Sequence, residues 1–205
     1  MSEPDRRAEG ATSASPAISG TGESLALLEV GSLARGVVVA DAVAKRAAVQ
    51  LLLCEPVSPG KYLVLFAGGV AEVEEAQAAG AQAAGEALVD RLFLPQPHLQ
   101  LLPAVRAGAR GFPHEASEEA AGLLELHSVA AALRSADAAC KAAEVRLQLL
   151  HLARGIGGKA WFILRGDLDS VEAAVMAATQ AAGDGLLAGA EVIARPHGDL
   201  RGVAL

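Results

Sequence analysis

The side chains in this chain that could do chemistry are five histidines, two cysteines and a lysine that follows a run of glycines. No histidine stands at ligand spacing from another, and the sequence has no Cys-x-x-Cys pair and no histidine–cysteine cluster. Because protein metal sites are built from such clusters, the sequence predicts no metal site. Cys54 and Cys140 are too few for a disulfide framework.

That lysine closes the stretch from Gly155 to Lys159, which is the best candidate for a phosphate-binding loop. A Walker loop needs a glycine where this chain has Ala153, and a serine or threonine where it has Ala160. The stretch also leads into an expected strand, whereas a phosphate cradle needs the N-terminus of a helix. We therefore expect no catalytic residues, no bound cofactor and no enzymatic activity.

Composition argues against two classes of partner. The 205 residues include 17 Lys and Arg against 24 Asp and Glu, a net charge of −7, and only 3% are aromatic. Nucleic-acid binding favours a basic surface with stacking rings, so we expect no nucleic-acid partner. No apolar run approaches the roughly 20 residues of a membrane-spanning helix, and the first residues lack the apolar core of a signal peptide. We expect a cytosolic protein with no membrane partner.

The chain repeats itself. Residues 27–53 match residues 123–149 at a constant offset of 96, so that Glu29 pairs with Glu125. Further along, the offset becomes 98 and pairs Lys61 with Lys159, and one more step pairs residues 97–98 with 196–197. A period this long predicts two similar domains rather than a solenoid of short repeats.

The boundaries follow from composition. Residues 1–22 are rich in Ser, Gly, Ala and Glu without periodicity, which is typical of a disordered tail. Residues 106–120 carry glycine, proline and acidic side chains, which is typical of a linker. We therefore expect a first domain over residues 23–105 and a second over residues 121–205.

Each unit shows the same order of elements. In the first we expect strands over 24–30, 49–57, 62–66 and 88–94, with helices over 33–47 and 70–84. In the second we expect strands over 122–126, 145–153, 160–165 and 187–194, with helices over 130–143 and 168–182. The order β-α-β-β-α-β predicts an α+β fold: two tandem ferredoxin-like domains, each an antiparallel sheet with helices on one face.

Four segments carry a resemblance to a known family: residues 40–45 (Ala-Asp-Ala-Val-Ala-Lys), 136–141 (Ala-Asp-Ala-Ala-Cys-Lys), 166–172 (Gly-Asp-Leu-Asp-Ser-Val-Glu) and 193–197 (Ile-Ala-Arg-Pro-His). In this order, and with the Ala-Asp-Ala-x-x-Lys motif found twice, they resemble the bacterial microcompartment shell-protein domain in its unpermuted form. Two such domains in one chain resemble the tandem, trimer-forming class.

The resemblance implies a structural role in a shell within the bacterial cytoplasm. Three chains would form a homotrimer, a ring of six similar domains, that tiles with hexameric and pentameric shell proteins around encapsulated enzymes. Small metabolites would cross a pore at its centre.

The resemblance places two loops at that pore. The residues it assigns as pore-lining are Val57, Ser58, Pro59 and Gly60 in the first domain and Arg154, Gly155, Ile156, Gly157 and Gly158 in the second. The second loop is two residues longer and lacks proline, so we expect it to be more mobile and to govern the aperture. Some relatives hold an iron–sulfur cluster on pore-loop cysteines, but neither loop here contains cysteine.

The resemblance also assigns residues to the rim where neighbouring tiles meet: Lys45, Lys141, Gln96, Arg195, His98 and His197. Without the resemblance, Lys45 and Lys141 indicate solvated helix faces, each with an aspartate four residues earlier. Gln96 stands where the second domain has Arg195, so alternate sides of the rim are expected to pack differently.

A second hypothesis comes from another class of protein. Duplicated ferredoxin-like domains can also form ligand-binding regulators, in which a metabolite occupies the interface between domains. A homotrimer with an axial channel favours the shell protein, whereas a dimer that binds one amino acid or nucleotide favours the regulator.

Overall fold

The computed structural model describes residues 24–108 and 119–200. The expected tail over residues 1–22 and most of the expected linker lie outside these ranges. No helix within the described ranges is both long and apolar enough to span a lipid bilayer.

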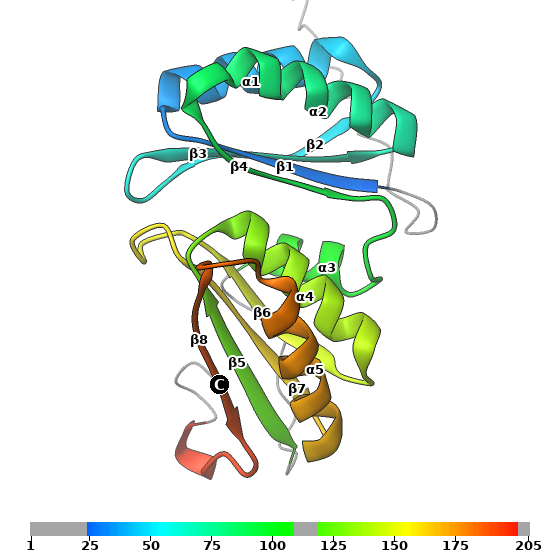
Figure 1. The fold of residues 1–205 in the computed structure, drawn as a ribbon, viewed down its shortest axis with the longest axis vertical. Coiled ribbons are helices and arrows are strands. Elements are labelled where there is room, and N and C mark those ends of the chain that lie inside the picture. Colours follow the sequence, from blue (N-terminus) through cyan, green and yellow to red (C-terminus); the bar gives the residue numbers. More distant parts are fainter. Residues whose placement is uncertain (1–23, 109–118, 201–205) are drawn as a thin grey trace, which may run out of the picture.

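The first domain is a four-stranded antiparallel sheet with two helices on one face (Figure 1). Its strands lie in the order β2-β3-β1-β4. Its elements are β1 (Ser24–Val30), α1 (Leu33–Arg46), β2 (Gln50–Val57), β3 (Lys61–Gly68), α2 (Val70–Ala84), a 3₁₀ turn (Gly85–Ala87) and β4 (Leu88–Leu94).

The second domain repeats this plan with strand order β6-β7-β5-β8. Its elements are β5 (Ala120–Leu126), α4 (Val129–Ala142), β6 (Arg146–Leu152), β7 (Ala160–Gly166), α5 (Leu168–Ala181), β8 (Leu187–Ile193) and a 3₁₀ turn (Gly198–Leu200). The predicted α+β fold with two β-α-β-β-α-β units is confirmed.

Local sequence explains why the helices start where they do and how closely they pack. Ser32 and Ser128 cap α1 and α4, each accepting a hydrogen bond from the backbone N–H three residues on. Gly80 allows α2 to approach both the sheet and α1, because a Cβ there would lie 2.5 Å from Leu28 Cδ1 on β1 and 2.7 Å from Val43 Cγ2 on α1.

One helix was not predicted. α3 (Leu101–Ala107) follows the first domain, and its Leu101 and Ala104 are buried at 0% and 1% exposure. Just before it, the Gln100 side chain donates to the carbonyl of Val145 and accepts from the N–H of Leu147, so its amide pairs with the edge of the second sheet. This helix is stabilised by its seat on the other domain rather than by a long periodic pattern.

The two domains stack. The face of the first sheet opposite α1 and α2 lies on α4 of the second domain (Figure 1). Leu27 and Leu63 of that face are fully buried in the same apolar cluster as Val129 and Leu133 of α4. α4 is therefore enclosed between two sheets, its own and that of the first domain.

Candidate functional site

The two predicted pore loops lie against each other. The β2–β3 and β6–β7 loops project on the same side of the molecule, at the left of Figure 1. A Cβ added to Gly158 would lie 2.8 Å from Pro59 Cδ and 3.0 Å from the Ser58 carbonyl oxygen. Lys61 Nζ also donates to the Gly158 carbonyl at 3.3 Å. The structure thus brings together candidates from both domains.

The second loop uses a backbone that favours glycine. Gly155, Gly157 and Gly158 have φ values of +73°, +69° and +83°, whereas Gly60 has +109° in the first loop. A Cβ on Gly157 would meet nothing within 4 Å. Gly157 therefore borders open space, while Gly158 fills the contact with the first loop.

Sequence reasoning missed the charge partner of Arg154. Its guanidinium donates to both carboxylate oxygens of Glu55 on β2, at 2.5 and 2.6 Å. This hydrogen bonding raises the pKa of Arg154. The pair joins a loop of the second domain to a strand of the first and balances the positive charge beside the loops.

A second missed residue, Glu29, holds the domains together from inside. Its side chain is fully buried and accepts two hydrogen bonds of 2.7 Å, from the N–H of Ala130 at the start of α4 and from Lys61 Nζ. A carboxylate at this end of a helix is favoured by the exposed N–H groups and the helix dipole. The repeat of Glu29 as Glu125, and of Lys61 as Lys159, was the available sequence signal.

Two first-domain residues of the predicted rim set, Gln96 and His98, lie on the second domain. Lys141 Nζ donates to the Gln96 carbonyl and to Asp137, both at 2.6 Å. The His98 N–H donates to the other oxygen of Asp137 at 2.7 Å. These contacts show that the segment after β4 is seated on α4.

The equivalent residues at the other ends of the chain are exposed. Lys45 pairs with Asp41 at 2.7 Å, and their side chains are 75% and 58% exposed. Arg195 is exposed, and the exposed side chain of His197 lies 3.5 Å from Asp199. The predicted i, i+4 pairs are present on both helices, but the surroundings of the two pairs differ.

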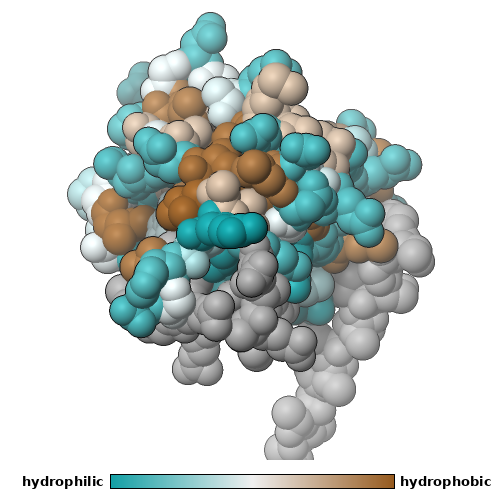
Figure 2. Space-filling view, turned by 90° about the horizontal axis from the view of Figure 1, so that it is seen from below, coloured by the Kyte–Doolittle hydropathy of each residue, from teal (hydrophilic) through white to brown (hydrophobic). Residues whose placement is uncertain are grey.

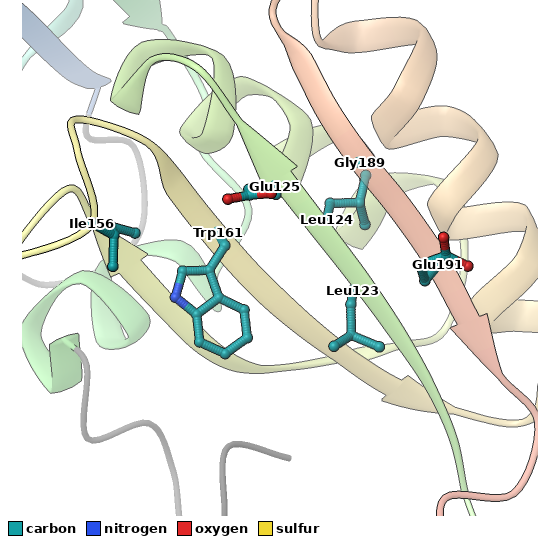
Figure 3. A pocket seen from close by; sticks show the side chains of 7 residues that line it. All are labelled: Leu123, Leu124, Glu125, Ile156, Trp161, Gly189 and Glu191. Carbon is teal, nitrogen blue, oxygen red and sulfur yellow. The ribbon is translucent and has the colours of Figure 1, made fainter.

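The open face of the second sheet carries a cavity of about 440 Å³. In Figure 3, Trp161 on β7 and Leu123 on β5 stand on neighbouring strands and point the same way. Figure 2 shows apolar side chains gathered on this end of the molecule with hydrophilic ones around them. The cavity is lined by Leu123, Leu124, Glu125, Ile156, Trp161, Gly189 and Glu191. The same face of the first sheet is the one that α4 covers.

In the part of the chain that the structure describes, the remaining reactive groups do not assemble into a metal site. Within residues 24–108 and 119–200, no group of three His, Cys, Asp or Glu side chains is placed to hold a metal ion. Cys54 is exposed on β2 and Cys140 is buried on α4. His151 lies beside Trp161, and burial lowers its pKa.

Comparison with known proteins matches both domains. The model of the BMC domain family matches residues 24–97 and 120–196. The chain is 41% identical over 176 residues to the bacterial microcompartment shell protein PduT of Citrobacter freundii, which covers 85% of this chain and 94% of PduT. It is 41% identical over 87 residues to the carboxysome shell protein CsoS1A of Hydrogenovibrio crunogenus, which covers 41% of this chain and 88% of CsoS1A.

Solved structures agree with this. A microcompartment protein from Desulfitobacterium hafniense superposes with a TM-score of 0.78 at 40% identity, covering 87% of this chain and 98% of that one. The fused permuted hexameric shell protein MSM0275 superposes with a TM-score of 0.60 at 21% identity, over 80% and 86% of the two chains, a likeness of fold alone.

Proposed function

We propose, from the premise that this chain belongs to the BMC-domain family, that three copies close into a ring of six domains with the paired loops around a central pore. Within the family the chain is a tandem-domain microcompartment shell protein like PduT, structural rather than enzymatic.

A single observation carries the ring: within the described residues, two surfaces that are joined inside the chain recur without a partner on α1 and on the second sheet. α4 lies on the first sheet, but the equivalent α1 and the equivalent face of the second sheet are both open. An interface between unlike surfaces of identical copies repeats from copy to copy, and it closes into a ring when the rotation allows. Because each copy has two domains, a ring of three copies contains six domains, as a hexamer of single-domain chains does.

The open helix exposes apolar side chains at positions that α4 buries. Leu33 and Val37 on α1 are 47% and 57% exposed, whereas their equivalents on α4, Val129 and Leu133, are fully buried. Covering such side chains stabilises an assembly by about 25 cal/mol for each Å² removed from water. α1 is therefore expected to pack against another copy of the chain.

The pore is proposed on the loops that the chain already pairs. Val57, Ser58, Pro59 and Gly60 line it from the first domain, and Arg154, Gly155, Ile156, Gly157 and Gly158 from the second. The contact of Gly158 with Pro59 supports this, because loops that touch within a copy are placed to touch again between copies. Small metabolites are the proposed cargo.

The rim of the ring is proposed to meet hexameric and pentameric shell proteins. The residues proposed there are Lys45, Lys141, Gln96, Arg195, His98 and His197, on domains spanning 23–105 and 121–205 joined by the linker 106–120. The exposed fraction of Lys45, 75%, and of Lys141, 47%, supports a surface role. Lys141→Asp tests it: the ring should persist while sheets fail to form, and loss of the ring itself would contradict the rim assignment.

Electron microscopy of the purified chain tests the ring. We expect hexagonal discs with a central hole and threefold symmetry. Discs with the β2–β3 and β6–β7 loops at the periphery would contradict the proposal. A gold label on Ser58→Cys, in a chain that also carries Cys54→Ser because Cys54 is exposed, locates the loops. A dimer that binds one amino acid or nucleotide would instead support the regulator hypothesis.

A further inference from the structure

We infer that Glu125 of one copy accepts a hydrogen bond from the backbone N–H of Ala34 in another copy, so that the open face of the second sheet holds the start of α1 of the neighbour. This inference rests on the proposed ring and names a hydrogen-bond acceptor at the interface between its copies. The cavity on the second sheet is, on this account, the seat of a helix rather than of a small ligand.

The template for this contact lies within the chain. Glu29 on β1 accepts from the N–H of Ala130, the second residue of α4, at 2.7 Å, and from Lys61 at 2.7 Å. Ser128, the N-cap of α4, also donates to Asp90 on the neighbouring strand β4 at 2.6 Å. The first sheet therefore recognises the N-terminal turn of α4 through its polar groups as well as its apolar face.

The same acceptor and counter-ion stand ready on the second sheet. Glu125 and Lys159 occupy the repeat positions of Glu29 and Lys61, and they already pair at 3.1 Å. Their side chains are 44% and 40% exposed, whereas Glu29 and Lys61 are 0% and 14% exposed. In a single copy, Glu125 is therefore an exposed acceptor that the α1 helix of a neighbouring copy can reach.

The matching donor is exposed at the start of α1. Ala34 is the repeat equivalent of Ala130, and it is exposed behind the N-cap Ser32. N–H groups in the first turn of a helix have no partner within the helix. A carboxylate placed there makes a charge-assisted bond, which is stronger than a neutral one.

One apolar pair across the proposed contact is matched in size. Trp161 stands where the first sheet has Leu63, so the second sheet presents the larger side chain. Val37 stands where α4 has Leu133, so α1 presents the smaller one. Leu63 and Leu133 belong to one buried cluster, and packing tolerates changes that conserve total volume. The cavity beside Trp161 and Leu123 is the space that the helix would fill.

The test compares Glu125→Ala and Glu125→Gln with Glu191→Gln, which removes a charge from the same open face. Losing a charge-assisted hydrogen bond should raise the concentration at which half of the trimer dissociates by about tenfold or more, measured by mass photometry. Glu191→Gln should leave it within about twofold.

A second readout separates a lost contact from general weakening. Hydrogen exchange at residues 33–36, remote in sequence from position 125, should quicken in the Glu125 variants at a concentration where they remain trimeric. Unchanged exchange and dissociation in both variants would overturn the inference even if the wild type is a trimer. A wild type that never forms trimers would overturn the proposed ring and this inference together, and a small molecule occupying the cavity of an intact ring would overturn the inference alone.

Discussion

Arg154, on a loop of the second domain, donates two hydrogen bonds to Glu55, on a strand of the first. This bidentate contact lies beside the two proposed pore loops. Its partners are 55% and 25% exposed, so its electrostatic value to the fold is modest.

Glu55→Gln should therefore change the pore more than the stability. Losing the carboxylate leaves the Arg154 charge unbalanced beside the loops, and a ring of such charges attracts anions. We expect the free energy of unfolding to fall by under about 1 kcal/mol. In assembled shells, an encapsulated enzyme with an anionic substrate should turn over faster, while one with a cationic substrate should slow. Rates that match those of wild-type shells for both substrates would contradict a pore position for Arg154.

Glu29→Ala should be far more damaging. It leaves Lys61, which is 14% exposed, and the N-terminus of α4 without their buried acceptor. Breaking a buried pair by removing one partner costs about 3 kcal/mol. Urea unfolding should record a loss of that size, and Asp41→Ala, which breaks the exposed pair with Lys45, should lose under about 1 kcal/mol. Similar losses in the two variants would refute the role given to Glu29.

Gly157→Phe should narrow the pore. The position has open space around it and a φ of +69°, so a phenylalanine side chain fits there at a backbone strain of about 1–2 kcal/mol. Gly60→Phe is the matched control, because that loop glycine also has open space and a positive φ. Solute entry into assembled shells should slow more for Gly157→Phe, and equal slowing would show that the second loop does not govern the aperture.

Cys140 should report on the seam between the domains. Burial raises the pKa of its thiol to about 12, so almost none is thiolate at pH 8, and alkylating reagents react with the thiolate. Cys54 has a raised pKa as well but is exposed. Mass spectrometry should find Cys54 labelled first and Cys140 only after the domains part. Early labelling of Cys140 would mean that the stacked arrangement opens readily.

Much of this fold could be predicted from the sequence because the same pattern of elements occurs twice in the chain. Helix starts such as Ser32 and Ser128 carry local capping signals, and the repeat fixed the order of elements. α3 escaped prediction because its seven residues owe their helix to contacts with β6.

The polar contacts between the two domains could not be predicted for a related reason. The identical residues Glu29 and Glu125 have different surroundings, since Glu29 accepts from the start of α4 whereas Glu125 pairs with Lys159. That helix starts a hundred residues later in sequence, and no local pattern joins the two. The pairing of Arg154 with Glu55 is equally remote.

The native mass of the full chain at micromolar concentration tests the ring of three copies most directly. One copy has a mass of 20.7 kDa, so we expect a species of three copies, about 62 kDa, with no stable dimer. A monomer or a closed dimer at every concentration would contradict it, because the exposed face of α1 and the open second sheet would then have no partner.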